Sequence, residues 1–168
     1  MKTNVQKLIK VWPMTIALLF VSAVITPAQQ EGDKLIPFET MASYHYSGVT
    51  EKKNLVITNK REWKKLWKLV HSREVPRPPL PKINFAERMV IAVFLGEQSD
   101  SARRISIVKL VKSGDQLRIF TKETLGNATC PGPPVTVQPY HIVVTDRIET
   151  TGENVIFEEP EQEIVKCG

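Results

Sequence analysis

The chain has 168 residues, of which 42% are hydrophobic and 24% charged, with 23 Lys and Arg against 18 Asp and Glu. Three of these 23 basic residues precede an apolar run near the N-terminus, so residues 29–168 hold 20 basic and 18 acidic side chains, a net charge of +2. This balance argues against a nucleic-acid-binding protein, and the length suits one ordinary domain.

Residues 1–28 have the pattern of a secretory signal peptide. Lys2, Lys7 and Lys10 precede the apolar run from Met14 to Ile25, and the small residue Ala28 follows it. The run is shorter than the roughly 20 residues of a membrane span. We therefore expect cleavage after Ala28, export to the periplasm or the exterior, and no stable membrane insertion of the mature chain.

The first part of the mature chain predicts an irregular leader, two short strands and a helix. The leader covers residues 29–41, and a single domain is expected over residues 42–168. Residues 42–47 and 54–58 have the alternation or β-branched content of strands. Asn59 is a suitable helix N-cap with Glu62 three residues later, and the next apolar residues repeat at helical spacing.

The second part of the chain predicts a β-sheet. The seven apolar residues 89–95 indicate a strand that is buried on both faces. Residues 104–112 and 116–122 flank a Ser-Gly-Asp turn, and residues 140–145 and 154–157 flank Thr-Thr-Gly-Glu, so we expect two hairpins. The predicted fold is mainly β or α+β: an antiparallel sandwich or roll with one amphipathic helix. Its predicted core contains Trp63, Leu66, Trp67, Val70, Phe85, Ile91, Val93, Ile107, Ile142 and Phe157.

Several stretches of the chain resemble the PrcB C-terminal domain family. They are LVITNKREWKKLW at 55–67, INFAERMVIAVFLGE at 83–97, PPVTVQPYHIV at 133–143 and NVIFEE at 154–159. The family consists of exported bacterial domains named for a subunit associated with a surface protease complex. The resemblance implies a protein partner such as an exported protease. Residues 97–104 lack the glycine and tyrosine that the family has in the corresponding turn.

The cysteines and histidines suggest a disulfide more than a catalytic site. Cys130 and Cys167 are both exported, and an even cysteine count in an oxidising compartment is typical of a disulfide. The alternative is a cysteine nucleophile with His141 as its base. His45, His71 and His141 are scattered, which disfavours a metal centre, and no serine-hydrolase motif occurs. We expect no catalytic residue, metal or cofactor.

The remaining interpretation is a non-catalytic binding or accessory domain that stabilises or docks a secreted protease or another enzyme. A loop-presenting protease inhibitor and a hydrolase with an unrecognised site are the alternatives. Two loops are candidates for contacting a protein partner, a polar one after the buried strand and a proline-rich one before residue 140. Their candidate residues are Gln98, Asp100, Arg103, Arg104, Pro133 and Pro134.

Overall fold

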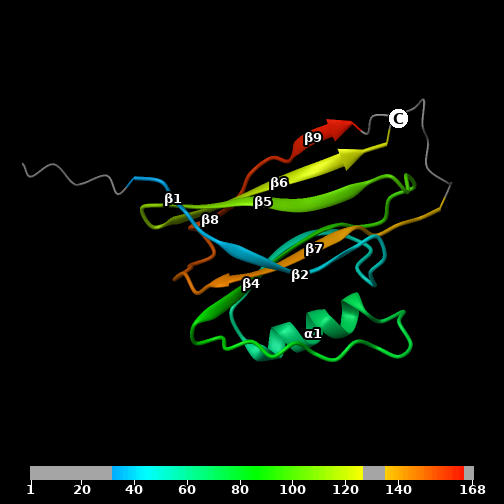
Figure 1. Ribbon diagram of the computed structural model, residues 1–168, viewed down its shortest axis with the longest axis horizontal. Helices are drawn as coiled ribbons and strands as arrows, with labels where there is room; N and C mark the ends of the chain where they lie inside the picture. The colour runs from blue at the N-terminus through cyan, green and yellow to red at the C-terminus, as the bar shows by residue number, and fades with distance from the viewer. Residues whose placement is uncertain (1–31, 127–134, 165–168) are drawn as a thin grey trace, which may run out of the picture.

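The computed structural model describes residues 32–126 and 135–164, which form two stacked β-sheets and one helix (Figure 1). The four-stranded sheet has the order β2-β7-β4-β3 and carries α1 on its outer face, so we call it the helix-covered sheet. The other sheet, called here the outer sheet, has the order β1-β5-β6-β8, and β9 also pairs with β6. The elements are β1 (Lys34–Leu35), β2 (Phe38–Tyr44), β3 (Lys52–Ile57), α1 (Lys60–Val70), β4 (Arg88–Leu95), β5 (Arg104–Ser113), β6 (Gln116–Leu125), β7 (Tyr140–Asp146), β8 (Val155–Phe157) and β9 (Glu161–Ile164).

The helix forms as its sequence predicts. The Asn59 side chain accepts a hydrogen bond of 3.0 Å from the backbone N–H of Glu62, which satisfies one of the free donors at the helix start. The buried face of α1 consists of the four predicted residues, Trp63, Leu66, Trp67 and Val70. This face covers the helix-covered sheet and closes the first of two hydrophobic clusters.

Strand β4 contributes to both clusters, which explains its uninterrupted apolar sequence. Val90, Ala92 and Phe94 belong to the cluster under α1, whereas Met89, Ile91 and Val93 belong to the cluster between the sheets. Successive side chains of a strand point to opposite faces, so a strand with a layer on each side needs apolar residues throughout.

Most of the predicted core is confirmed by the burial of its members. Eight of the ten residues are buried, and Phe85 and Phe157 are half-buried and pack against the edges of the two clusters. The predicted hairpin of β5 and β6 is also confirmed, with Gly114 in its turn at φ 60°.

The second predicted hairpin is wrong. β7 lies between β2 and β4 in the helix-covered sheet, so both of its edges are already occupied. The chain therefore crosses to the outer sheet after β7, and β8 pairs there with β6 in parallel. β9 continues along β6 in the same direction, which makes the outer sheet mixed rather than antiparallel.

The predicted leader is more ordered than expected. Residues 34–35 form β1, and β2 begins at Phe38 instead of at residue 42. β1 pairs with β5 in the outer sheet and β2 with β7 in the other, so this segment joins the two sheets at one edge.

Candidate partner-binding surface

Four connections meet at one end of the sandwich, on the right in Figure 1: residues 45–51, 71–75, 96–103 and 135–139. We call this region the loop end. Backbone hydrogen bonds tie the connections together: Gly48 N donates to Val70 O at 3.1 Å, and Gln138 N donates to His45 O at 2.7 Å. Glu97 N adds a bond of 3.0 Å to Thr50 O. The loop end is therefore one connected surface.

Two glycines allow this close packing. A Cβ on Gly48 would collide with the backbone carbonyl of Leu69 at the end of α1. Gly96 has φ +71°, and a Cβ there would lie 2.7 Å from both Thr50 O and Lys52 N. Only glycine meets both the steric and the conformational requirement at residue 96.

The structure brings together the two loops that the sequence singled out. Gln98 N donates to Val137 O at 2.8 Å, and Val137 N donates back to Gln98 O at 2.9 Å. The Gln98 side chain donates a third bond, of 2.9 Å, to Leu95 O. Pro133 and Pro134, the proposed contact residues of the proline-rich loop, lie outside the described residues.

The other candidate residues of the polar loop make internal contacts. Asp100 accepts bonds of 2.9 Å from the backbone N–H groups of Ala102 and Gly126. Arg103 pairs with Glu123 at 2.6 Å, and Arg104 donates to backbone carbonyl groups of its own loop. All of these loop residues are half-buried, so their described contacts stabilise the loop end from within.

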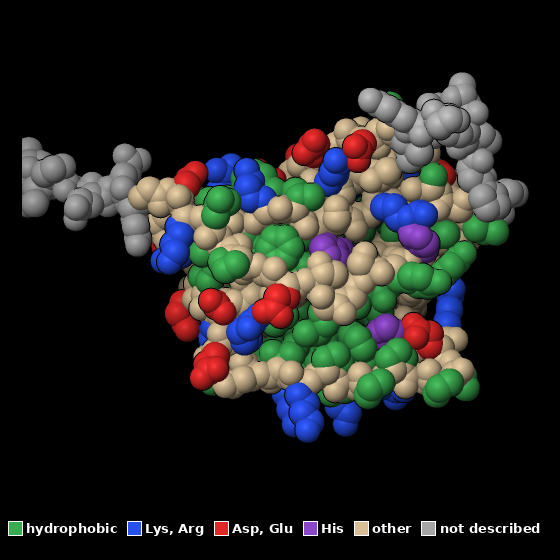
Figure 2. All heavy atoms as spheres, viewed as in Figure 1, with side chains coloured by type: hydrophobic (Ala, Val, Ile, Leu, Met, Phe, Trp, Pro, Cys, Tyr) green, Lys and Arg blue, Asp and Glu red, His purple; other side chains and the backbone are tan. Residues whose placement is uncertain are grey.

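Two tyrosines that the sequence analysis did not select are exposed at the loop end. Tyr44 is 57% and Tyr46 is 44% exposed, and their rings meet edge to face at 5.8 Å. Together with Arg73 and Glu74 they line a hollow of about 290 Å³. In Figure 2, hydrophobic side chains gather near charged ones on the right-hand side, where this end of the molecule lies. Tyrosine and arginine are enriched among the residues that dominate protein interfaces.

The tyrosines could have been found from their spacing. Residues i and i+2 of an extended chain lie on the same face, and Tyr44 and Tyr46 have this spacing. The alternation predicts a strand through residue 47, but β2 ends at Tyr44. The second tyrosine therefore belongs to the loop end and not to a buried strand face.

Below this surface lies a buried polar layer. His71 caps α1, its Nδ1 is 2.6 Å from Glu74 Oε1, and its ring centroid is 4.1 Å from that of Trp67. Burial raises the pKa of Tyr140 to about 12, with smaller effects from Glu74 and Tyr44, so its phenol stays neutral. Burial and then the charge of Arg104 lower the pKa of His45.

His141 is not placed to act as a catalytic base. It is 5% exposed, and its Nδ1 accepts a bond of 2.8 Å from the backbone N–H of Ile107. The remaining ring proton is then on Nε2, which lies 2.9 Å from Thr40 Oγ1. Both nitrogens are used in structural bonds, and burial lowers the pKa of the ring. Cys130, the thiol considered with it, and Cys167 lie outside the described residues.

Within residues 32–126 and 135–164, no group of three or more histidine, cysteine, aspartate or glutamate side chains is arranged to hold a metal ion. No helix in this part of the chain is long and apolar enough to cross a membrane.

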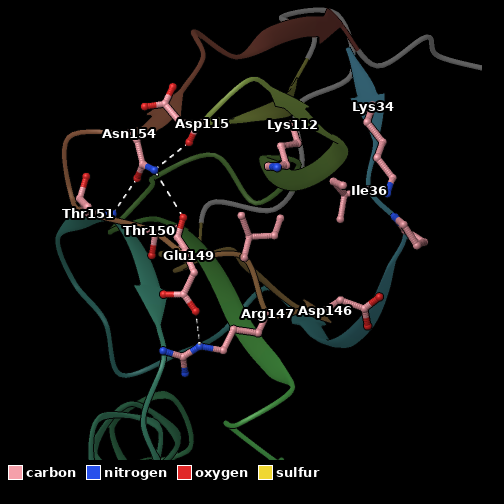
Figure 3. Close-up of a pocket in the computed structure, with 12 residues that line it drawn as sticks. Lys34, Ile36, Lys112, Asp115, Asp146, Arg147, Glu149, Thr150, Thr151 and Asn154 are labelled. Atoms are coloured by element: carbon pink, nitrogen blue, oxygen red, sulfur yellow. Dashed lines mark hydrogen bonds and ion pairs between the residues drawn. The ribbon is translucent and has the colours of Figure 1, made fainter. Parts of the chain in front are cut away.

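A further hollow lies at the opposite end of the sandwich, between β1, the β5–β6 turn and the β7–β8 connection (Figure 3). Its volume is about 660 Å³. Lys34 and Lys112 lie on one side and Asp115 and Glu149 on the other, while Asn154 ties the connection to the turn through a bond of 2.7 Å to Asp115 O. The charges of its lining residues are mixed, with Lys34, Lys112 and Arg147 beside Asp115, Asp146 and Glu149.

Comparison with known proteins gave no match to any family model, curated protein or solved structure.

Proposed function

We propose that this protein is an exported, non-catalytic binding or accessory domain that docks a protein partner through the loop end. The preferred partner class is a secreted protease or another secreted enzyme. That preference, and the expectation of export, rest on the PrcB resemblance and the signal-peptide pattern of residues 1–28.

The observation that carries the proposal is the exposure of Tyr44, at the end of β2, and of Tyr46 beside Arg73, where the adjoining loops are hydrogen-bonded to one another. Aromatic side chains supply a large contact area with few rotatable bonds. Because the supporting loops are already ordered, little conformational entropy is lost on docking. Exposed aromatic side chains on ordered, hydrogen-bonded loops favour a binding function over a catalytic one.

The state of the histidines also favours a binding role. General-base catalysis needs a ring nitrogen within hydrogen-bonding reach of the substrate. The nitrogens of His141 bond to Ile107 and Thr40, and His71 Nδ1 pairs with Glu74 beneath the surface.

Site-specific photo-crosslinking tests the proposal. A photoreactive phenylalanine analogue at Tyr46 in the protein expressed in its host is expected to trap one predominant exported protein, identified by mass spectrometry. The same analogue at Val108, which is also 44% exposed but lies in β5, is the matched control. The purified captured protein is then expected to bind the domain, and to bind the Tyr44→Ala, Tyr46→Ala variant at least tenfold more weakly. Equal trapping at both positions, or equal affinity of the variant, would contradict docking through the loop end.

A further inference from the structure

Strand β3 is an open edge of the helix-covered sheet. Among the described strands it pairs only with β4. Leu95 N donates to Pro139 O, and Arg147 N donates to Glu87 O, so the odd-numbered residues along β4 direct their backbone groups toward β7. The even-numbered residues then face β3, since backbone groups alternate along an antiparallel strand.

The register identifies the free backbone groups. β3 residues opposite the even-numbered residues of β4 are Lys53, Leu55 and Ile57, which are bonded within the sheet. The intervening residues, Asn54 and Val56 among them, direct their N–H and C=O groups away from β4. Such a row is a template for a further strand.

Each face of this edge has a hollow. On the helix side, a hollow of about 240 Å³ has an apolar floor that includes Leu55 and Leu66, and its charged lining residues are Lys53, Lys65 and Glu62, two basic and one acidic. On the side facing the outer sheet, a hollow of about 370 Å³ is lined by apolar side chains including Val56, Val155 and Phe157, and by Thr58, Thr150 and Gly152. An added strand alternates its side chains between the two faces, so each hollow can receive every second residue.

The helix beside the edge carries unbalanced positive charge. α1 has five exposed basic residues and one acidic residue, and within the described structure none of the five forms an ion pair. Lys60 and Lys64, Arg61 and Lys65, and Lys64 and Lys68 are like-charge pairs at i,i+4, which weaken a helix slightly. Figure 2 shows basic side chains along the lower edge, where α1 lies. An acidic partner would relieve this repulsion.

We propose that the open edge of β3 takes up an extended acidic segment of a protein partner as an additional strand. Alternate apolar side chains of the segment fill the hollow beside Val56, Val155 and Phe157. The intervening acidic side chains face Lys53 and Lys65. A second copy of the chain is a poor occupant, because two antiparallel β3 edges would place lysines near lysines. This site does not use Tyr44 or Tyr46, so it is independent of docking through the loop end.

The test uses the purified full mature chain and a blocked peptide in which glutamate and valine alternate. NMR titration is expected to shift the amide signals of Asn54 and Val56 and to protect them from exchange. Asn54→Pro removes an outward N–H that β4 does not use, and proline is tolerated on edge strands. This variant is expected to bind the peptide at least tenfold more weakly than wild type. Its unfolding midpoint is measured to show that it is folded.

Charge reversal provides the second variant and its matched control. The variant with both Lys53→Glu and Lys65→Glu is expected to bind the glutamate–valine peptide at least tenfold more weakly than wild type. It is expected to bind a peptide of alternating lysine and valine more tightly than wild type does. Lys34→Glu, on β1 at the far edge of the outer sheet, is expected to leave both affinities unchanged. If the Asn54→Pro variant does not fold, a peptide with N-methylated backbone amides is used instead, and it is expected to bind wild type more weakly than the unmethylated peptide.

Three results would overturn the proposal. The first is no binding of the peptide to wild type up to about 1 mM. The second is an affinity for the peptide that is unchanged from wild type in both Asn54→Pro and the double lysine variant. The third is a set of amide shifts confined to the loop end. A concentration-dependent dimer abolished by Asn54→Pro would also overturn it, because the occupant would then be a second copy of the chain.

Discussion

At the scale of single residues, His141 joins the two sheets through its neutral imidazole. It lies on β7, and its Nδ1 accepts from the N–H of Ile107 where β5 has a register shift. A bulge leaves a backbone group without a strand partner, and here the histidine supplies one. A protonated ring would present an N–H to this N–H, so the bond requires the neutral form.

The pH dependence of stability follows from this geometry. Burial lowers the pKa of His141 below its ordinary value of 6.5, so the unfolded chain binds a proton more readily as the pH falls. The contribution of His141 is therefore fully present above about pH 6.5 and declines below it. Urea midpoints are expected to be flat at neutral pH and to fall in acid, with a smaller fall for His141→Gln. The pKa of His45 is also lowered, so His45→Gln is measured as a control for the contribution of that residue. An identical fall of the urea midpoint in wild type and in His141→Gln would contradict the role of His141.

Trp67 is expected to be a structural residue. It is buried, and its indole N–H donates to Pro78 O at 3.2 Å, which ties the proline-rich connection to α1. Trp67→Ala should lower the free energy of unfolding by about 3–5 kcal/mol in urea denaturation. Lys68→Ala, exposed on the same helix, should change it by less than about 0.5 kcal/mol. Ready quenching of tryptophan fluorescence by iodide in the folded protein would contradict the assignment.

At the scale of elements, local patterns predicted what local forces determine. The N-cap at Asn59, the apolar face of α1, the doubly buried β4 and the Gly114 turn are all encoded within short windows. The pairing of β8 is not local. Residues 140–145 and 154–157 have the signal of a hairpin, but the competition of β2 and β4 for the edges of β7 decides the outcome.

The polar loop shows the same limit for the candidate site. The sequence indicates its residues as candidates because they are polar and follow a buried strand, and this pattern does not distinguish free side chains from bonded ones. Asp100 and Arg103 have partners distant in sequence, Gly126 and Glu123, which a local pattern does not reveal. The sequence does not indicate Tyr44 and Tyr46 as contact residues, because the end of β2 depends on its pairing with β7.

The ion pair of Arg103 with Glu123 should stabilise the attachment of this loop to β6. The Glu123 side chain is only 8% exposed and its distance to Arg103 is 2.6 Å. Arg103→Ala leaves a largely buried carboxylate without this partner, which should lower the free energy of unfolding by about 1–3 kcal/mol. Arg103→Ala combined with Glu123→Gln should recover part of the loss, as measured in a double-mutant cycle. A single variant as stable as wild type would show that water replaces the arginine.

The arrangement of β6 and β9 bears on the predicted disulfide. These strands are parallel, and Leu125 is the register partner of Ile164. Cys130 and Cys167 lie outside the described residues, and in the sequence they follow Leu125 by five residues and Ile164 by three. Mass analysis without reduction is expected to find the two peptides linked, and replacing both cysteines with serine should cost about 3–4 kcal/mol. Free thiols in freshly exported protein would contradict the bond and restore Cys130 as a candidate nucleophile.

At the scale of the whole molecule, the sandwich separates a rigid core from the surfaces available for contact. Two clusters fix the layers, and the four connections of the loop end depend on one another through backbone bonds. The open edge of β3 begins near the loop end, since Gly96 lies against Lys52. One partner could therefore reach both surfaces, and the two contacts would then reinforce each other through effective concentration.

The binding proposal makes a prediction for the activity of the intact partner system. His45→Gln, His71→Gln and His141→Gln, introduced singly, should leave this activity within a few-fold of wild type when folding is intact, because the binding proposal gives none of the three a role on a substrate. Tyr44→Ala with Tyr46→Ala should reduce it at least tenfold without lowering the unfolding midpoint, since both side chains are exposed. Val108→Ala, equally exposed apolar surface on β5, should have no effect. The activity and the circular-dichroism melting curve are measured on the same preparations. Loss of activity in one histidine variant, with the tyrosine variant fully active, would contradict the binding proposal and support an enzyme instead.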